Sequence, residues 1–219
     1  MTELTSDDTA TFHFIDGNCD AVPPQGFEEF FGKPPYYRFI EPDDKDKEKP
    51  AEDVLSRIRD FPECETPEQT MRELMREGVA DSRKSTDTAM NYLFKVMEEQ
   101  GPFDGVIGYS EGATVAATLL LKEQLRSEEQ GVEPMFKCGI FFMGWPPLDP
   151  KTYFLVLSDQ SERIIDVPTC HISEFFLSLA CPSPACPPVI CRSLCRRLEN
   201  AEKRGGVAVA VMESQVSIF

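Results

Sequence analysis

The chain has 219 residues, and its 38 acidic and 22 basic side chains give a formal net charge of −16. This charge repels phosphate backbones and anionic lipid heads, so it disfavours binding to nucleic acid or to a membrane surface. The first residues lack the basic and apolar regions of a signal peptide, and no run approaches the ~20 apolar residues that span a bilayer. These properties predict a soluble, cytoplasmic protein.

The first predicted strand covers residues 9–16, which are β-branched and aromatic and run into Gly17. The next stretch, residues 19–50, holds six prolines with aromatic residues between them and then a run of charges. Prolines at this density oppose regular structure, so we expect a long loop that forms a rim or lid. Its charged part is expected to be a solvated surface.

Strands and helices then alternate. Ser85 or Thr86 is predicted to cap a helix that ends at Glu99, because apolar residues recur at helical spacing and Gly101-Pro102 follows. Residues 105–108 form a short apolar run typical of a buried strand, and the Ala- and Leu-rich residues 112–125 predict a buried helix. Further strands are expected at 136–143 and 167–172. This order predicts an α/β fold, a mostly parallel sheet with helices on both faces.

The sequence Gly-Tyr-Ser-Glu-Gly at 108–112 falls between a predicted strand and a predicted helix. A G-x-S-x-G nucleophile elbow requires this context, because its serine occupies a strained turn where only small neighbours fit. Ser110 is therefore the candidate catalytic nucleophile. The backbone N–H of Glu111, at the amino end of the helix, is the candidate donor to an oxyanion. We assign no catalytic role to the side chains of Tyr109 and Glu111.

Five segments together resemble the fungal family of serine hydrolases that includes thioesterases and esterases of polyketide pathways. They cover residues 11–17, 34–39, 85–121, 136–150 and 165–172. The resemblance implies an α/β-hydrolase fold, a Ser-Asp-His triad, no metal or cofactor, and small ester or thioester substrates in fungal secondary metabolism. It also implies a location in the cytoplasm or nucleus. Only Ser110 transfers directly from the family pattern.

The resemblance also indicates what this sequence lacks. Family members have an earlier strand with an oxyanion loop, and a late acid and His that complete the triad, so the chain is expected to be truncated at both ends and its sheet incomplete. The two histidines, His13 and His171, lie within predicted strands and are interpreted as core or surface residues. No aspartate is carried over; the candidates Asp149, Asp159 and Asp166 precede the expected position of the acid.

The texture of the sequence changes after Ile172, so we predict a serine hydrolase domain at residues 1–172 and an irregular tail at 173–219. Four tail cysteines lack the paired spacing of a zinc site. They are Cys181, Cys186, Cys191 and Cys195. One hypothesis is that the tail is translated intron or a shifted reading frame.

The functional prediction is a serine hydrolase that forms an acyl-enzyme on Ser110 and acts on a carboxylic ester or thioester. Loss of a triad base costs on the order of a million-fold in turnover, so this exact chain is expected to be nearly inert. The alternative is a non-catalytic hydrolase-like module that binds an acyl ligand or a protein. The sequence leaves the substrate and the oligomeric state open.

Overall fold

A computed structural model describes residues 10–22, 28, 32–41, 69, 83–142, 144–157 and 161–172, and the backbone of a strand at 207–213. The charged part of the predicted loop and the four tail cysteines lie outside these residues.

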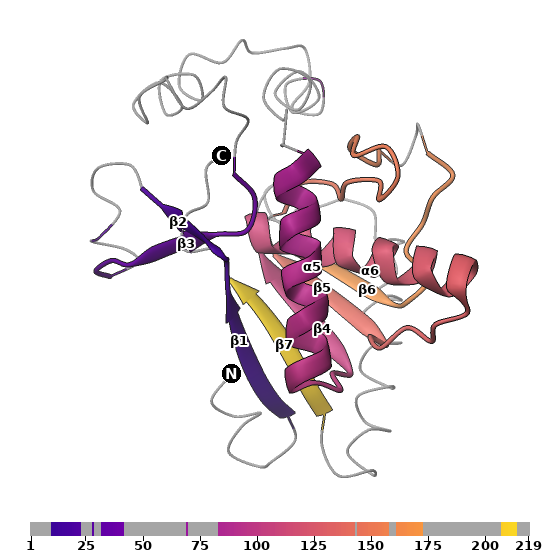
Figure 1. The fold of residues 1–219 in the computed structure, drawn as a ribbon, viewed down its shortest axis with the longest axis horizontal. Coiled ribbons are helices and arrows are strands. Elements are labelled where there is room, and N and C mark those ends of the chain that lie inside the picture. The colour runs from indigo at the N-terminus through magenta and orange to yellow at the C-terminus, as the bar shows by residue number, and fades with distance from the viewer. Residues whose placement is uncertain are drawn as a thin grey trace, which may run out of the picture.

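The centre of the fold is a five-stranded sheet with the strand order β1-β7-β4-β5-β6 (Figure 1). Its members are β1 (Ala10–Asp16), β4 (Gly105–Tyr109), β5 (Cys138–Phe142), β6 (Thr169–Ile172) and β7 (Val207–Glu213). All four pairings between neighbours are parallel. The predicted parallel sheet is confirmed, and the strand that leads to Ser110 is the central one.

One strand of this sheet comes from the C-terminal tail. Strand β7 pairs with β1 along seven residues, from Ala10↔Val207 to Asp16↔Glu213, and with β4 on its other side. The prediction of an irregular tail is therefore wrong for residues 207–213. The physical reason is visible in their sequence, VAVAVME, whose apolar and β-branched residues suit an interior strand.

Two helices pack against the sheet. Helix α5 (Arg83–Gln100) buries a stripe that includes Met90, Leu93 and Met97. Helix α6 (Glu111–Gln130) is buried from Gly112 to Leu121 and contacts β4, β5 and β7. The helix predicted at 112–125 is confirmed and extended. The predicted cap at Ser85 or Thr86 is wrong, because α5 already includes Arg83 and the Ser85 hydroxyl accepts a hydrogen bond from the N–H of Glu41 (2.7 Å).

A second, two-stranded antiparallel sheet lies beside the end of β1 (Figure 1). It pairs β2 (Cys19–Ala21) with β3 (Tyr36–Arg38). The Pro-rich stretch was expected to be loop throughout, so this pairing is a correction. A Cβ on Gly17 would lie 2.2 Å from the carbonyl carbon of Arg38, so the turn after β1 needs a glycine where β3 crosses it.

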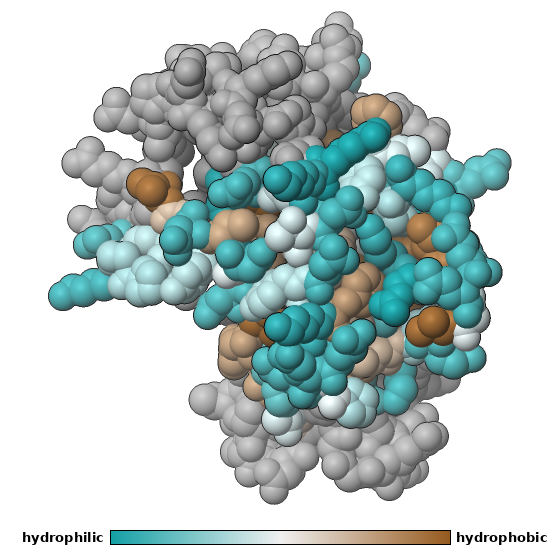
Figure 2. Space-filling model, viewed as in Figure 1, coloured by the Kyte–Doolittle hydropathy of each residue, from teal (hydrophilic) through white to brown (hydrophobic). Residues whose placement is uncertain are grey.

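The core lies between the helices and the main sheet. Phe103 and Phe136 stack with their ring centroids 6.4 Å apart, and both are almost fully buried. Full burial of each such side chain contributes about 1.5–3 kcal/mol relative to exposure. The outer side over α5 is mainly hydrophilic (Figure 2). Within the described helices, none combines the length and the hydropathy needed to cross a membrane.

Candidate active site

Ser110 occupies the turn between β4 and α6, as the sequence predicts. Its backbone has φ 54° and ψ −117°, a combination that side chains disfavour. The surrounding hydrogen bonds enforce it: the Ser110 N–H donates to the Phe142 carbonyl (2.8 Å), and the Ser110 carbonyl accepts from the N–H of Ala113 (3.0 Å). Strand β4 thus ends in a sharp turn that delivers Ser110 to the amino end of a helix.

Glycines allow this turn to pack tightly. A Cβ on Gly108 would lie 2.4 Å from the Cα of Ala113 and equally close to the Gly112 carbonyl oxygen. A Cβ on Gly144, in the loop after β5, would lie 2.5 Å from the Cβ of Ala113. The first turn of α6 is therefore in direct contact with the end of β4 and with this loop, and no side chain fits between them.

The side chain of Glu111 reaches away from the helix to the segment after β3. Its carboxylate accepts hydrogen bonds from the N–H groups of Phe39 (3.1 Å) and Ile40 (3.2 Å). The Arg38 Nε lies 3.9 Å from the same carboxylate. The sequence predicted only the backbone role of Glu111, and it offered no signal for these contacts because the partners lie 71 and 72 residues earlier.

The segment that Glu111 holds is itself part of the core. Phe39 and Ile40 are buried, and the N–H of Glu41 is fixed on Ser85 at the beginning of α5. Residues 38–41 therefore bridge the amino-terminal turns of both helices. Cys19 lies next to this segment, and burial, with the nearby carboxylates of Glu41 and Glu111, raises the pKa of its thiol. The neutral thiol is favoured, which makes Cys19 a poor competing nucleophile.

His13 lies at the opposite end of the sheet from Ser110. It pairs across β7 with Val106, four residues before Ser110. With about 3.3 Å per residue and about 4.8 Å between strands, its Cα is roughly 13 Å along and 10 Å across from that of Ser110. Its ring contacts Phe103 edge-on, with centroids 5.2 Å apart.

His171 lies two strands away from Ser110, on the other side. It is in register with Phe141 and, through it, with Gly108, so its Cα is roughly 10 Å across and 7 Å along from that of Ser110. The imidazole packs on the Phe141 ring (centroids 5.0 Å apart), and burial lowers its pKa. In the described part of the chain, no hydrogen bond joins either imidazole to Ser110.

The aspartates near the expected acid position have other surroundings. Burial of Asp149 opposes ionisation, but the N–H groups of Thr152 and Lys151 and the Arg163 guanidinium, 2.9 Å away, outweigh it and lower the pKa. Asp149 therefore closes a turn. Asp166 lines a cavity remote from Ser110, and Asp159 lies outside the described residues.

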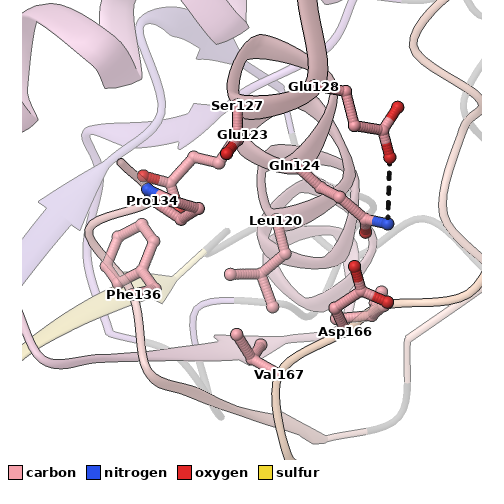
Figure 3. Close-up of a pocket in the computed structure, with 10 residues that line it drawn as sticks. Leu120, Glu123, Gln124, Ser127, Glu128, Pro134, Phe136, Asp166 and Val167 are labelled. Carbon is pink, nitrogen blue, oxygen red and sulfur yellow. Dashed lines mark hydrogen bonds between the residues drawn. The ribbon is translucent and has the colours of Figure 1, made fainter. Parts of the chain in front are cut away.

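That cavity, of about 170 Å³, lies between the second half of α6 and the segments around Phe136 and Val167 (Figure 3). Glu123 is buried there and accepts hydrogen bonds from the backbone N–H groups of Met135 and Phe136. Burial nonetheless raises the pKa of this carboxyl. Ser110 lies at the amino end of α6, and Glu123 follows it by 13 residues, or about 20 Å at 1.5 Å per residue. The cavity is therefore separate from the candidate active site.

The sequence is also similar to a known protein family. The model of the family described as "Serine hydrolase (FSH1)" matches residues 1–173. The chain belongs to this family. As a member of the FSH1 serine hydrolases, it is similar to "Esterase FPY3" of Fusarium mangiferae, with 35% identity over 97 residues that cover 42% of this chain and 42% of that protein.

Two other relatives match over similar lengths. "Esterase C25G4.2" of Caenorhabditis elegans is 35% identical over 97 residues, covering 42% of this chain and 41% of that protein. "Hydrolase phiM" of Talaromyces stipitatus is 27% identical over 97 residues, covering 43% of this chain and 38% of that protein. The aligned part thus spans less than half the length of these relatives. No solved structure matches the chain.

Proposed function

We propose that this FSH1-family chain is a serine hydrolase whose Ser110 hydroxyl attacks the carbonyl carbon of a carboxylic ester or thioester. The observation that carries the proposal is the buried Ser110 at φ 54°, held between the central strand and the amino end of α6. A serine in this strained turn presents its hydroxyl at the carboxyl edge of the sheet. The esterase names of two relatives are consistent with the ester class.

The reaction would proceed through an acyl-enzyme. Attack by the Ser110 oxygen forms a tetrahedral intermediate, and the backbone N–H of Glu111 donates to its oxyanion, because the first N–H groups of a helix point outward along its axis. Expulsion of the alcohol or thiol leaves an ester on Ser110, which water then hydrolyses to the free acid. In a complete triad, a His accepts the serine proton and later returns it to the leaving group.

We further propose that turnover by this exact chain is slow. The positions of His13 and His171 in the sheet support this, since each is two strands from Ser110 and packs on a phenylalanine. An enzyme without its base keeps only the residual catalysis that its oxyanion donors and substrate binding supply, about 10³–10⁴-fold over water. Both acylation and deacylation are then expected to be slow, because the His of a complete triad transfers protons in each step.

A fluorophosphonate probe and a p-nitrophenyl ester test the proposal. We expect slow labelling of the purified chain, with the added mass on the peptide that contains Ser110, and steady-state ester hydrolysis close to background. Ser110→Ala should abolish labelling, while Glu99→Gln, which alters an exposed ion pair with Lys95, should not change it. Fast multiple turnover would contradict the impaired triad, and labelling elsewhere would contradict the role of Ser110.

The second candidate function is a non-catalytic hydrolase-like module. The same placement of the two histidines favours it, because a serine without a base is weakly nucleophilic. In that case the probe would leave Ser110 unmodified after prolonged incubation. Saturable binding of a non-hydrolysable alkyl thioether analogue of an acyl thioester, measured by calorimetry, would then identify the module as an acyl-ligand binder.

A further inference from the structure

Glu111 places a carboxylate on the residue that directly follows Ser110. A negative charge there opposes the negative charge that develops on the substrate oxygen. Here, the carboxylate accepts hydrogen bonds from the backbone N–H groups of Phe39 and Ile40. The Arg38 Nε lies 3.9 Å away, and only about a sixth of the Glu111 side chain is exposed. These donors stabilise the negative charge and hold the carboxylate against residues 38–40, away from the turn at Ser110.

The same contacts restrain the peptide group that follows Ser110. Phe39 and Ile40 are both almost completely buried, so their N–H groups are fixed in space by the packing of their side chains. Each Glu111 carboxylate oxygen has its own donor, Oε2 from Phe39 and Oε1 from Ile40, so the carboxylate cannot rotate without losing a hydrogen bond. A side chain held at its far end limits the backbone movement of its own residue.

We propose that Glu111 is a positioning residue: its side chain, anchored on the N–H groups of Phe39 and Ile40, fixes its own backbone N–H toward the oxyanion formed at Ser110. The inference rests on the proposed function and adds a residue whose side chain acts at a distance from the reacting atoms. Positioning of this kind raises the rate because a donor that is already aimed needs no reorganisation in the transition state.

Replacement of Glu111 by glutamine separates positioning from charge. Glu111→Gln removes the negative charge, which alone would stabilise a neighbouring oxyanion. It also replaces one acceptor oxygen by an NH₂ group, which would then face a backbone N–H donor. If positioning dominates, Glu111→Gln lowers the rate of Ser110 phosphonylation, and if the charge dominates, the rate rises.

Ser85→Ala is the matched control. It releases the same segment at its other end, where the Glu41 N–H donates to the Ser85 hydroxyl, without touching the nucleophile turn. A purely structural role of Glu111 in holding residues 38–41 would make the two variants behave alike. Hydrogen exchange at the Phe39, Ile40 and Glu41 amides reports the loosening of the segment in each protein, and the melting temperature reports whether each is folded.

The experiment compares labelling rates of the full chain and its variants with a fluorophosphonate. We expect about a tenfold or larger decrease in Glu111→Gln and a further decrease in Glu111→Ala, with faster exchange at Phe39 and Ile40, whereas Ser85→Ala keeps the wild-type rate. An unchanged or raised rate in Glu111→Gln would overturn the positioning role while the wild-type labelling upheld the proposed function. If wild-type Ser110 is not labelled, the proposed hydrolase function is contradicted, and the positioning role, which depends on it, is contradicted too.

Discussion

At the scale of single residues, Ser110 has a strained backbone conformation. A side chain at its φ of 54° and ψ of −117° costs about 1–3 kcal/mol, whereas glycine adopts such angles easily at an entropic cost of about 0.5–1 kcal/mol. We expect Ser110→Gly to be more stable than Ser110→Ala by about 1 kcal/mol, as measured by urea unfolding. Both variants should lose fluorophosphonate labelling. Equal stability of the two would mean that the turn relaxes in solution.

The buried carboxyl group of Glu123 should make the stability of the protein depend on pH. Burial raises its pKa above the ordinary 4.5, so the folded state binds this proton more tightly than the unfolded state does. Its contribution to stability is then fully present below pH 4.5 and is lost as the pH rises through the raised pKa. A tenfold difference in proton affinity between the two states corresponds to about 1.4 kcal/mol.

Glu123→Gln removes this titration but keeps an acceptor for the Met135 N–H. The unfolding free energy of the variant, relative to the wild type, should therefore increase between pH 4 and pH 8. Glu129→Gln, which changes an exposed partner of Lys151, is the control for general charge effects. A difference that stays constant with pH would show that Glu123 ionises as an ordinary glutamate.

The sequence predicted these sites unevenly, for a physical reason. Ser110 was found because the elbow is a local pattern, in which five consecutive residues define the turn and its context. The carboxylate contacts of Glu111 were not found, since their partners, Phe39 and Ile40, lie 72 and 71 residues earlier in the chain. The burial of Glu123 was missed for the same reason: a glutamate on a helix is usually solvated, and here distant residues, Met135 and Phe136, donate hydrogen bonds to it.

At the scale of elements, the junction of β4 and α6 depends on Gly108. A methyl group there would lie 2.4 Å from backbone atoms of Gly112 and Ala113, which cannot move without displacing the helix. We expect Gly108→Ala to destabilise the protein by on the order of 3 kcal/mol, the upper part of the range for overpacking. Thermal and urea unfolding would measure this loss.

Gly139→Ala is the matched control for Gly108→Ala. Gly139 is buried on the neighbouring strand β5, but its added Cβ would meet only the ends of two side chains, Phe141 Cζ at 2.8 Å and Leu120 Cδ1 at 3.1 Å. Side-chain ends can shift, so the cost should be clearly smaller, about 1 kcal/mol. A Gly108→Ala variant as stable as Gly139→Ala would show that α6 is less tightly docked than these distances indicate.

Element boundaries illustrate where local patterns fail. The apolar periodicity predicted α5, which buries one stripe, and the Ala- and Leu-rich composition predicted α6, which is buried from Gly112 to Leu121. Their ends were less accurate, because Ser85 was taken for a cap and in fact binds the Glu41 N–H from outside the helix. The strands β2 and β3 are only three residues each, and their pairing across 15 or more residues leaves no local periodicity to detect.

At the scale of the whole molecule, the order of strands along the chain differs from their order in the sheet. The last strand in sequence, β7, occupies the second place, between the first strand and the central one. The alternation of strands and helices predicted a parallel sheet but said nothing about the tail, whose prolines and cysteines dominated its interpretation. The short apolar run at 207–212 was the signal that could have indicated this strand.

The interior place of β7 makes the integrity of the whole sheet depend on the tail. A proline at Ala210 would remove a backbone N–H in the middle of a strand that pairs on both sides, and its ring would clash with the ladder. We expect Ala210→Pro to cost about 3 kcal/mol or more. We also expect faster hydrogen exchange in β1 and β4, because among the described strands β1 joins the sheet through β7. Ala210→Ser keeps the N–H and should preserve protection in both strands. Unchanged exchange at residues 10–16 in the proline variant would show that β1 does not depend on β7. It would contradict the arrangement in which β7, a strand from the tail, lies between β1 and β4.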